Sequence, residues 1–148
     1  MKTTQRRSAF TLIEVLIVVV IMAILAATII PQFTDSTKDA KTSTAKMNVA
    51  TLRSQIQLYR TQHAGLNPTA ALIELTQVTD INGVQGTGPT FVYGPYLRQV
   101  PTNPFTNLNT VTTTTSDPLT TAPAGTGGWI YNVTTGNVWL DNATLYTF

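Results

Sequence analysis

The hydrophobic pattern divides the chain into an apolar amino-terminal run, a helical middle and a turn-rich remainder. The run Phe10–Ile30 is almost wholly aliphatic, and as a helix it would be about 31 Å long, enough to cross the hydrocarbon core of a membrane. Its aliphatic side chains favour insertion by about 4 to 8 kcal/mol, which exceeds the cost of one acid, Glu14, near the edge of the run. Pro31 follows, and we expect a kink there at the membrane boundary.

The segment after Pro31 keeps a helical rhythm as far as Gly65 and Pro68. Apolar side chains recur at spacings of four and three, which predicts one buried stripe: Ala45, Val49, Leu52, Ile56 and Tyr59. The stretch "TDSTKDAKTST" is rich in weak helix formers, so we expect the helix to loosen there. His63 lies at the predicted helix end, where capping explains it better than catalysis does.

Residues 66–148 contain short apolar runs separated by Gly, Pro and Thr. "ALIELTQV" predicts a short helix or an extended segment, whereas "TFVYGPYL" and "GWIYNVTTGNVWLDN" predict strands. The last reads as a hairpin with Gly136 in the left-handed position of its turn, and "TVTTTTSDPLTTAPAGTGG" predicts a mobile loop. A small antiparallel sheet packed on the helical stripe gives an α+β fold, with Trp129, Tyr131 and Trp139 in its core.

Composition and charge narrow the function classes. The chain has no cysteine, so disulfides and thiolate chemistry are excluded. Its pI of about 9.1 comes from the amino terminus and from residues 32–60, because acids outnumber bases in residues 61–148. We therefore expect no nucleic-acid partner. The sequence has one histidine and no phosphate loop, nucleophile elbow or metal-spaced cluster, so we predict that it is not an enzyme.

Three interpretations of the amino terminus compete. A secretory signal peptide would need a shorter apolar core and a small-x-small cleavage site, and a generic signal anchor leaves Glu14 unexplained. The third interpretation rests on resemblance. A short basic leader, a small residue, "FTLIEVLIVVVI" and a closing Pro31 together resemble the cleavage and methylation signal of the type IV pilin and type II secretion pseudopilin family. The bases Lys2, Arg6 and Arg7 would keep the amino terminus cytoplasmic.

The resemblance implies that a prepilin peptidase cuts between Ala9 and Phe10 and then N-methylates Phe10, although the family usually has Gly before the cut. It implies a leader (1–9), a transmembrane assembly helix (10–31), a helical stem (32–65) and a β-rich head (66–148). The new ammonium of Phe10 would attract Glu14 by about 4 kcal/mol at about 4 Å. The sequence leaves open whether that amine is its own or a neighbour's, or whether Glu14 only favours the helix dipole; the resemblance favours the neighbour.

The carboxy-terminal half resembles pseudopilins more than pilins, through "GPYLRQVPTNPFTN" and the lack of a cysteine pair. This implies a structural subunit of a type II secretion pseudopilus, anchored in the inner membrane with its head in the periplasm. Its partners would be itself, other pseudopilins, the prepilin peptidase and an inner-membrane assembly platform. A type IV pilin and a DNA-uptake competence pseudopilin are the alternatives.

Calcium is the one cofactor that the resemblance raises. Major pseudopilins often hold a calcium ion in their carboxy-terminal loop, whereas here only Asp117 and Asp141 are available nearby and the acid-rich pattern is missing. We therefore expect no cofactor, with calcium at these two residues as the alternative.

Overall fold

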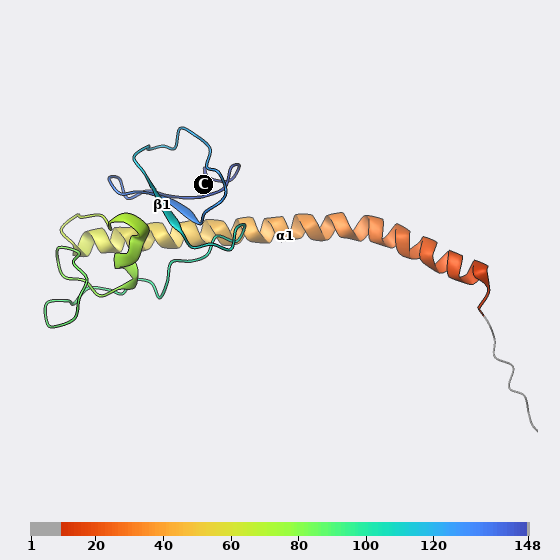
Figure 1. Ribbon diagram of the computed structural model, residues 1–148, viewed down its shortest axis with the longest axis horizontal. Coiled ribbons are helices and arrows are strands. Elements are labelled where there is room, and N and C mark those ends of the chain that lie inside the picture. The colour runs from red at the N-terminus through yellow and green to blue at the C-terminus, as the bar shows by residue number, and fades with distance from the viewer. Residues whose placement is uncertain (1–9, 148) are drawn as a thin grey trace, which may run out of the picture. The chain divides into compact units, whose positions relative to one another are not determined.

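The computed structural model describes residues 10–147, and the chain divides into two compact units, Met1–Asp39 and Ala40–Phe148. The elements follow in the order α1 (Leu12–Gln62), η1 (Ala70–Thr76), β1 (Val111–Thr114), β2 (Trp129–Asn132) and β3 (Val138–Leu140) (Figure 1). A long helix and a small three-stranded sheet make an α+β fold, as the sequence predicted.

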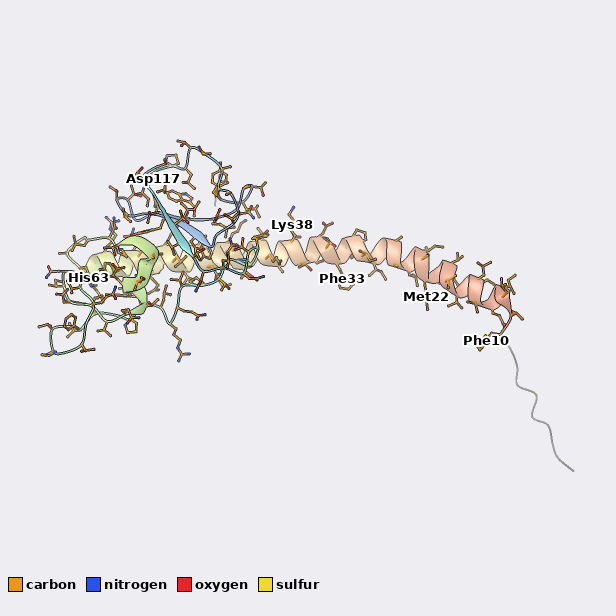
Figure 2. The ribbon with its side chains drawn as sticks, viewed as in Figure 1. Phe10, Met22, Phe33, Lys38, His63 and Asp117 are labelled. Atoms are coloured by element: carbon orange, nitrogen blue, oxygen red, sulfur yellow. The ribbon has the colours of Figure 1, made fainter. Side chains whose placement is uncertain are left out.

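The apolar part of α1 is exposed along its whole length. Each residue from 10 to 40 is exposed, and Figure 2 shows the side chains of Phe10, Met22 and Phe33 standing clear of the ribbon. Within the described residues, α1 is the helix that is long and apolar enough to cross a membrane. An exposed aliphatic surface of this length needs lipid or protein around it to be stable in a cell.

The helix continues through Pro31 and through the Thr- and Ser-rich segment after it. Our expectation that the helix loosens in that segment is wrong. Four hydroxyl groups of the segment donate to carbonyl oxygens one turn earlier in the helix, at 2.8 to 3.1 Å. They belong to Thr34, Ser36, Thr37 and Thr44. These side chains therefore find their partners inside the helix and do not compete with it through turn conformations.

The predicted helical stripe forms one side of the head's core, as expected. Ala45, Val49, Leu52, Ile56 and Tyr59 are each at most 2% exposed. They share one cluster with side chains from η1 and the sheet, including Leu72, Leu75, Trp129, Tyr131, Val138 and Leu140. Full burial of such a side chain stabilises the fold by about 1.5 to 3 kcal/mol. The helix and the sheet are therefore held together mainly by this apolar contact.

The sheet has the order β1-β2-β3 and is mixed. The predicted hairpin is confirmed: β2 and β3 are antiparallel, and Gly136 in their turn has a φ of +79°. The prediction of a wholly antiparallel sheet is wrong, because β1 pairs with β2 in parallel, with Val111 opposite Trp129. β1 lies in the segment that we expected to be a loop; its threonines are β-branched and suit a pleated strand.

The first predicted strand is absent from residues 90–97, where the backbone is irregular apart from a single bridge at Tyr93. Tyr93 and Thr79 exchange two backbone hydrogen bonds at 2.9 and 3.1 Å, and the pairing goes no further. Pro95, which lacks an N–H, follows two residues after Tyr93 and cannot extend a ladder. η1 covers most of the "ALIELTQV" segment as 3-10 helix, so of the two predicted forms the structure shows the short helix, interrupted at Ala71 and Leu72, whose φ angles are +68° and +55°.

Candidate functional site

The first turn of α1 places Thr11 and Glu14 in reciprocal contact. The backbone N–H and the hydroxyl of Thr11 both donate to Glu14 Oε2 at 2.7 Å, and the Glu14 N–H donates to Thr11 Oγ1 at 3.3 Å. This is a capping box, in which an N-cap threonine and the acid three residues later satisfy each other's first-turn donors. The acid in the apolar run therefore has a partner within its own chain.

The capping box leaves part of the Glu14 carboxylate available. In the chain from residue 10 onward, the hydrogen bonds to this carboxylate all end on Oε2, and none ends on Oε1. The side chain lies in an apolar hollow with Phe10, Val15 and Val18. A carboxylate at a helix amino terminus is stabilised by the dipole, but in apolar surroundings it still favours a cation strongly. The free oxygen can accept one further charged donor.

The other predicted assembly residues lie in different surroundings. Phe10 is 86% exposed, one turn before Glu14, and Ala9 lies outside the described residues, as does the bond proposed for cleavage. Pro31 is in the same helix, about 25 Å further along its axis, so it does not contribute to this site. The site is thus the first turn of α1, formed by Phe10, Thr11 and Glu14.

Thr11 is the residue of this site that our sequence analysis missed. The signal was present, because Thr followed three residues later by Glu, just before an apolar run, is the pattern of a capping box.

The two calcium candidates lie at opposite ends of the β2–β3 hairpin. Asp117 Oδ2 accepts a bond from the Asn137 amide at 2.7 Å, and Asn137 pairs with the carboxyl end of β2. The Asp141 N–H donates to the Gly128 carbonyl, which precedes β2. The length of the strand, roughly 10 Å, separates the two ends, whereas ligands of one calcium ion lie within about 5 Å of each other. They cannot share an ion.

His63 caps the helix end from inside the head, where the sequence predicted a cap. Its ring is fully buried, Nδ1 lies 2.8 Å from the Tyr59 carbonyl oxygen, and Nε2 lies 2.9 Å from Thr79 Oγ1. The ring is packed against Tyr59 and Tyr93. Nδ1 is thus occupied by a carbonyl of α1, and Nε2 joins the helix end to the loop that follows η1. Figure 2 shows His63 within the head and Asp117 on a different loop of it.

Residues 10–147 contain no group of three His, Asp or Glu side chains that could hold a metal ion. The buried acids have structural contacts instead: Glu74 accepts from the Thr69 backbone and hydroxyl, and Asp141 from backbone amides. The arrangement that the structure does provide for chemistry beyond folding is an exposed apolar helix with one half-satisfied carboxylate in its first turn.

Comparison with known proteins identifies both parts of the chain. Residues 4–30 match the prokaryotic N-terminal methylation motif, and residues 32–122 match the family described as type II secretion system, protein G. The chain is 28% identical to the type II secretion system core protein G of Pseudomonas aeruginosa over 103 residues, which are 70% of this chain and 71% of the relative. It is 25% identical to the protein of the same name from Vibrio cholerae over 107 residues, 72% of this chain and 71% of that relative. No solved structure matches.

These matches separate the alternatives that the sequence left open. The family match covers the second half of α1 and much of the head, and it is to a secretion component, not to a type IV pilin or a competence protein. The methylation motif covers the first turn of α1, which holds Thr11 and Glu14. The chain therefore belongs to the type II secretion system protein G family and is a pseudopilin subunit of a type II secretion system.

Proposed function

We propose that this pseudopilin is cut between Ala9 and Phe10 by a prepilin peptidase, is N-methylated at Phe10, and polymerises through α1. Support for the processing step comes from the methylation motif at residues 4–30, which includes the proposed bond. Alanine is the smallest side chain after glycine, so the bond remains accessible to the peptidase, and replacement by glycine should speed the cut.

The observation that carries the assembly proposal is the half-satisfied carboxylate of Glu14. Thr11 donates both of its hydrogen bonds to Oε2, whereas no residue of the described range 10–147 donates to Oε1, and the helix around this carboxylate is exposed and apolar. In the mature chain the free amine at Phe10 carries a positive charge near neutral pH. When one copy packs against the next, the Phe10 amine of a neighbouring copy binds Oε1 and fixes the axial offset between the two helices. In lipid, such a pair is worth several kcal/mol.

The subunit then works as a structural component and not as an enzyme. It waits in the inner membrane as a single-pass protein with its amino terminus in the cytoplasm and its head in the periplasm, which agrees with the bases at Lys2, Arg6 and Arg7. An inner-membrane platform extracts it into a pseudopilus together with other pseudopilins. The growing pseudopilus moves exported proteins towards the outer membrane.

The test compares Glu14→Gln with Glu14→Val in cells that carry the whole secretion system. Glutamine keeps an oxygen for the Thr11 cap but loses the charge, and valine loses both. We expect both variants to insert into the membrane and both to be excluded from pseudopili. The yield of sheared filaments and chemical cross-linking that needs no cysteine measure this. Normal assembly of Glu14→Gln would contradict the ion pair and leave only a capping role for this residue.

Processing is tested separately by intact-mass analysis of the membrane-bound protein. We expect a mature chain that starts at Phe10 and carries one methyl group, and a higher processed fraction in the Ala9→Gly variant. A mature chain that starts at Met1, or one cut near Ala27, would contradict the processing proposal.

A further inference from the structure

The carboxy-terminal loop of the head closes on the carboxylate of Asp141. The Gly125 N–H donates to Asp141 Oδ1 at 2.7 Å and the Gly127 N–H donates to Oδ2 at 2.5 Å, so each oxygen binds a different amide of the same turn. The Asp141 N–H in turn donates to the Gly128 carbonyl at 3.2 Å. Asp141 is 6% exposed. The residue after β3 is therefore joined to the turn before β2 by three hydrogen bonds.

A second buried side chain closes the same turn from the other side. Asn103 is fully buried, and its amide nitrogen lies 3.1 to 3.2 Å from the carbonyl oxygens of Gly127, Gly128 and Asp141. Thr106 Oγ1 also donates to the Gly127 carbonyl, at 2.8 Å. The polar groups of Gly127 are thus satisfied on both sides, its N–H by Asp141 and its carbonyl by Asn103 and Thr106. We call Asp141, Asn103 and the turn Gly125–Gly128 the carboxylate latch.

The latch has the wrong polarity for a cation. A calcium ion needs about six to eight oxygen atoms directed at it. Around Asp141 the structure directs backbone N–H groups instead, whose positive ends face the two carboxylate oxygens. The carbonyls of the turn are directed away, towards Asn103 and Thr106. An ion at Asp141 would have to displace both amides and would gain few oxygens in exchange.

Steric fit supports the same conclusion. A Cβ on Gly127 would lie 2.8 Å from Asp141 Oδ2 and 3.3 Å from Thr110 Oγ1. The backbone of the turn therefore lies against the carboxylate itself, at a separation that only glycine allows. No ion-sized space separates the carboxylate from the turn, and Asp117, the other acid of this region, is at the far end of the hairpin.

We propose that the carboxylate latch takes the place of the calcium ion that major pseudopilins often hold in this loop, so that the head folds and stays folded without a metal. The N–H groups of Gly125 and Gly127 supply the positive potential that an ion would supply. The hydrogen bonds of Asn103 hold the backbone carbonyls that an ion would otherwise hold. Asp141 is then a structural anion and not a ligand. The proposal concerns the head alone and does not depend on how α1 assembles.

The test is thermal unfolding of the full chain in detergent micelles, followed by tryptophan fluorescence. The two tryptophans, Trp129 and Trp139, lie in β2 and β3 next to the latch. We expect the Tm to be the same in excess CaCl2 and in excess EGTA. A Tm that rises with CaCl2 or falls with EGTA would overturn the proposal.

Two substitutions complete the test. Asp141→Asn replaces one acceptor by a donor that faces an amide, so the Tm should fall by about 5 °C or more, and CaCl2 should not restore it. The matched control is Asp117→Asn, which changes an exposed acid with one bond to a side chain and should shift the Tm much less. If Asp141→Asn does not fold, calorimetric titration of the wild-type chain with CaCl2 decides: saturable binding overturns the proposal, and no binding supports it.

Discussion

The ring of His63 lies flat on the ring of Tyr59, with centroids 3.7 Å apart and planes 10° from parallel. Tyr96 meets the same tyrosine edge-on at 5.6 Å, and the Tyr59 hydroxyl is packed against the backbone of Gly83. The end of α1 is therefore surrounded by aromatic rings from the loop that follows η1. This packing decides how the head responds to alkali.

Alkaline pH should destabilise the head. Burial, together with the nearby charge of Glu74, raises the pKa of Tyr59 to about 12, against about 10 in an unfolded chain. A raised pKa means that the folded state holds its proton more tightly, so this contribution is fully present below pH 10 and is lost as the pH rises through 12. Urea unfolding at increasing pH should show falling stability above pH 10. Tyrosinate absorbance with a single midpoint near 10 in the folded protein would contradict this.

Truncation of the helical stripe should cost far more than truncation of the outer face of the same helix. Leu52 is fully buried, and Leu52→Ala should lower the free energy of unfolding by about 2 to 5 kcal/mol, through lost burial and a residual cavity. The matched control is Leu58→Ala on the same helix, because Leu58 is 44% exposed; its loss should be less than half as large. Urea titrations followed by tryptophan fluorescence measure both. Equal losses would show that the stripe does not form the core.

Two glycines with similar backbone angles should differ in their tolerance of alanine. Gly136 and Gly65 both have positive φ, +79° and +87°. Each Gly→Ala change costs about 1 to 2 kcal/mol for the left-handed backbone. A Cβ at Gly136 would lie 2.8 Å from Asn67 Oδ1, whereas nothing lies within 4 Å at Gly65. Gly136→Ala should therefore be the more destabilising of the two in the same unfolding assay, and the reverse order would contradict the packing of the hairpin turn.

Loss of the cap should loosen the first turn of α1. Thr11→Val removes the hydroxyl that bonds to Glu14 and should cost about 1 kcal/mol, which is about fivefold faster amide exchange in the first turn. Hydrogen exchange of the micelle-bound chain measures the effect. Thr28→Val is the control, because the Thr28 hydroxyl donates to the Leu25 carbonyl within the helix and caps nothing. Equal exchange in the first turn of both variants would mean that the capping box does not hold the helix start.

Local periodicity predicted the parts of the fold that depend on neighbours in sequence. The stripe from Ala45 to Tyr59 and the hairpin at Gly136 were correct, because a helix and a two-strand turn each repeat within a few residues. β1 was missed because its partner, β2, follows after a long connection and the pairing is parallel. Such a pairing leaves no local signal in a run of threonines.

The candidate site, like the fold, was predicted only in part from the sequence. Glu14 was found because an acid in an apolar run demands a neutralising group, but its bond to Thr11 was overlooked. Asp141 was noted only as a candidate metal ligand. Its two glycine amides could not be foreseen, because they come from a turn whose conformation depends on Asn103, far away in the sequence.

The hydroxyl groups that bond within α1 affect how the helix meets a bilayer. These hydroxyls already donate to backbone carbonyls of the same helix; they belong to Thr28, Thr34, Ser36 and Thr37. When this stretch moves from water into the headgroup layer, none of these hydroxyl donors loses its hydrogen bond. The hydroxyls therefore add little to the free-energy cost of moving the helix along the membrane normal. Asp35 and Lys38 are the first charges beyond the apolar run, and burying either of them in hydrocarbon would cost far more than burying these hydroxyls.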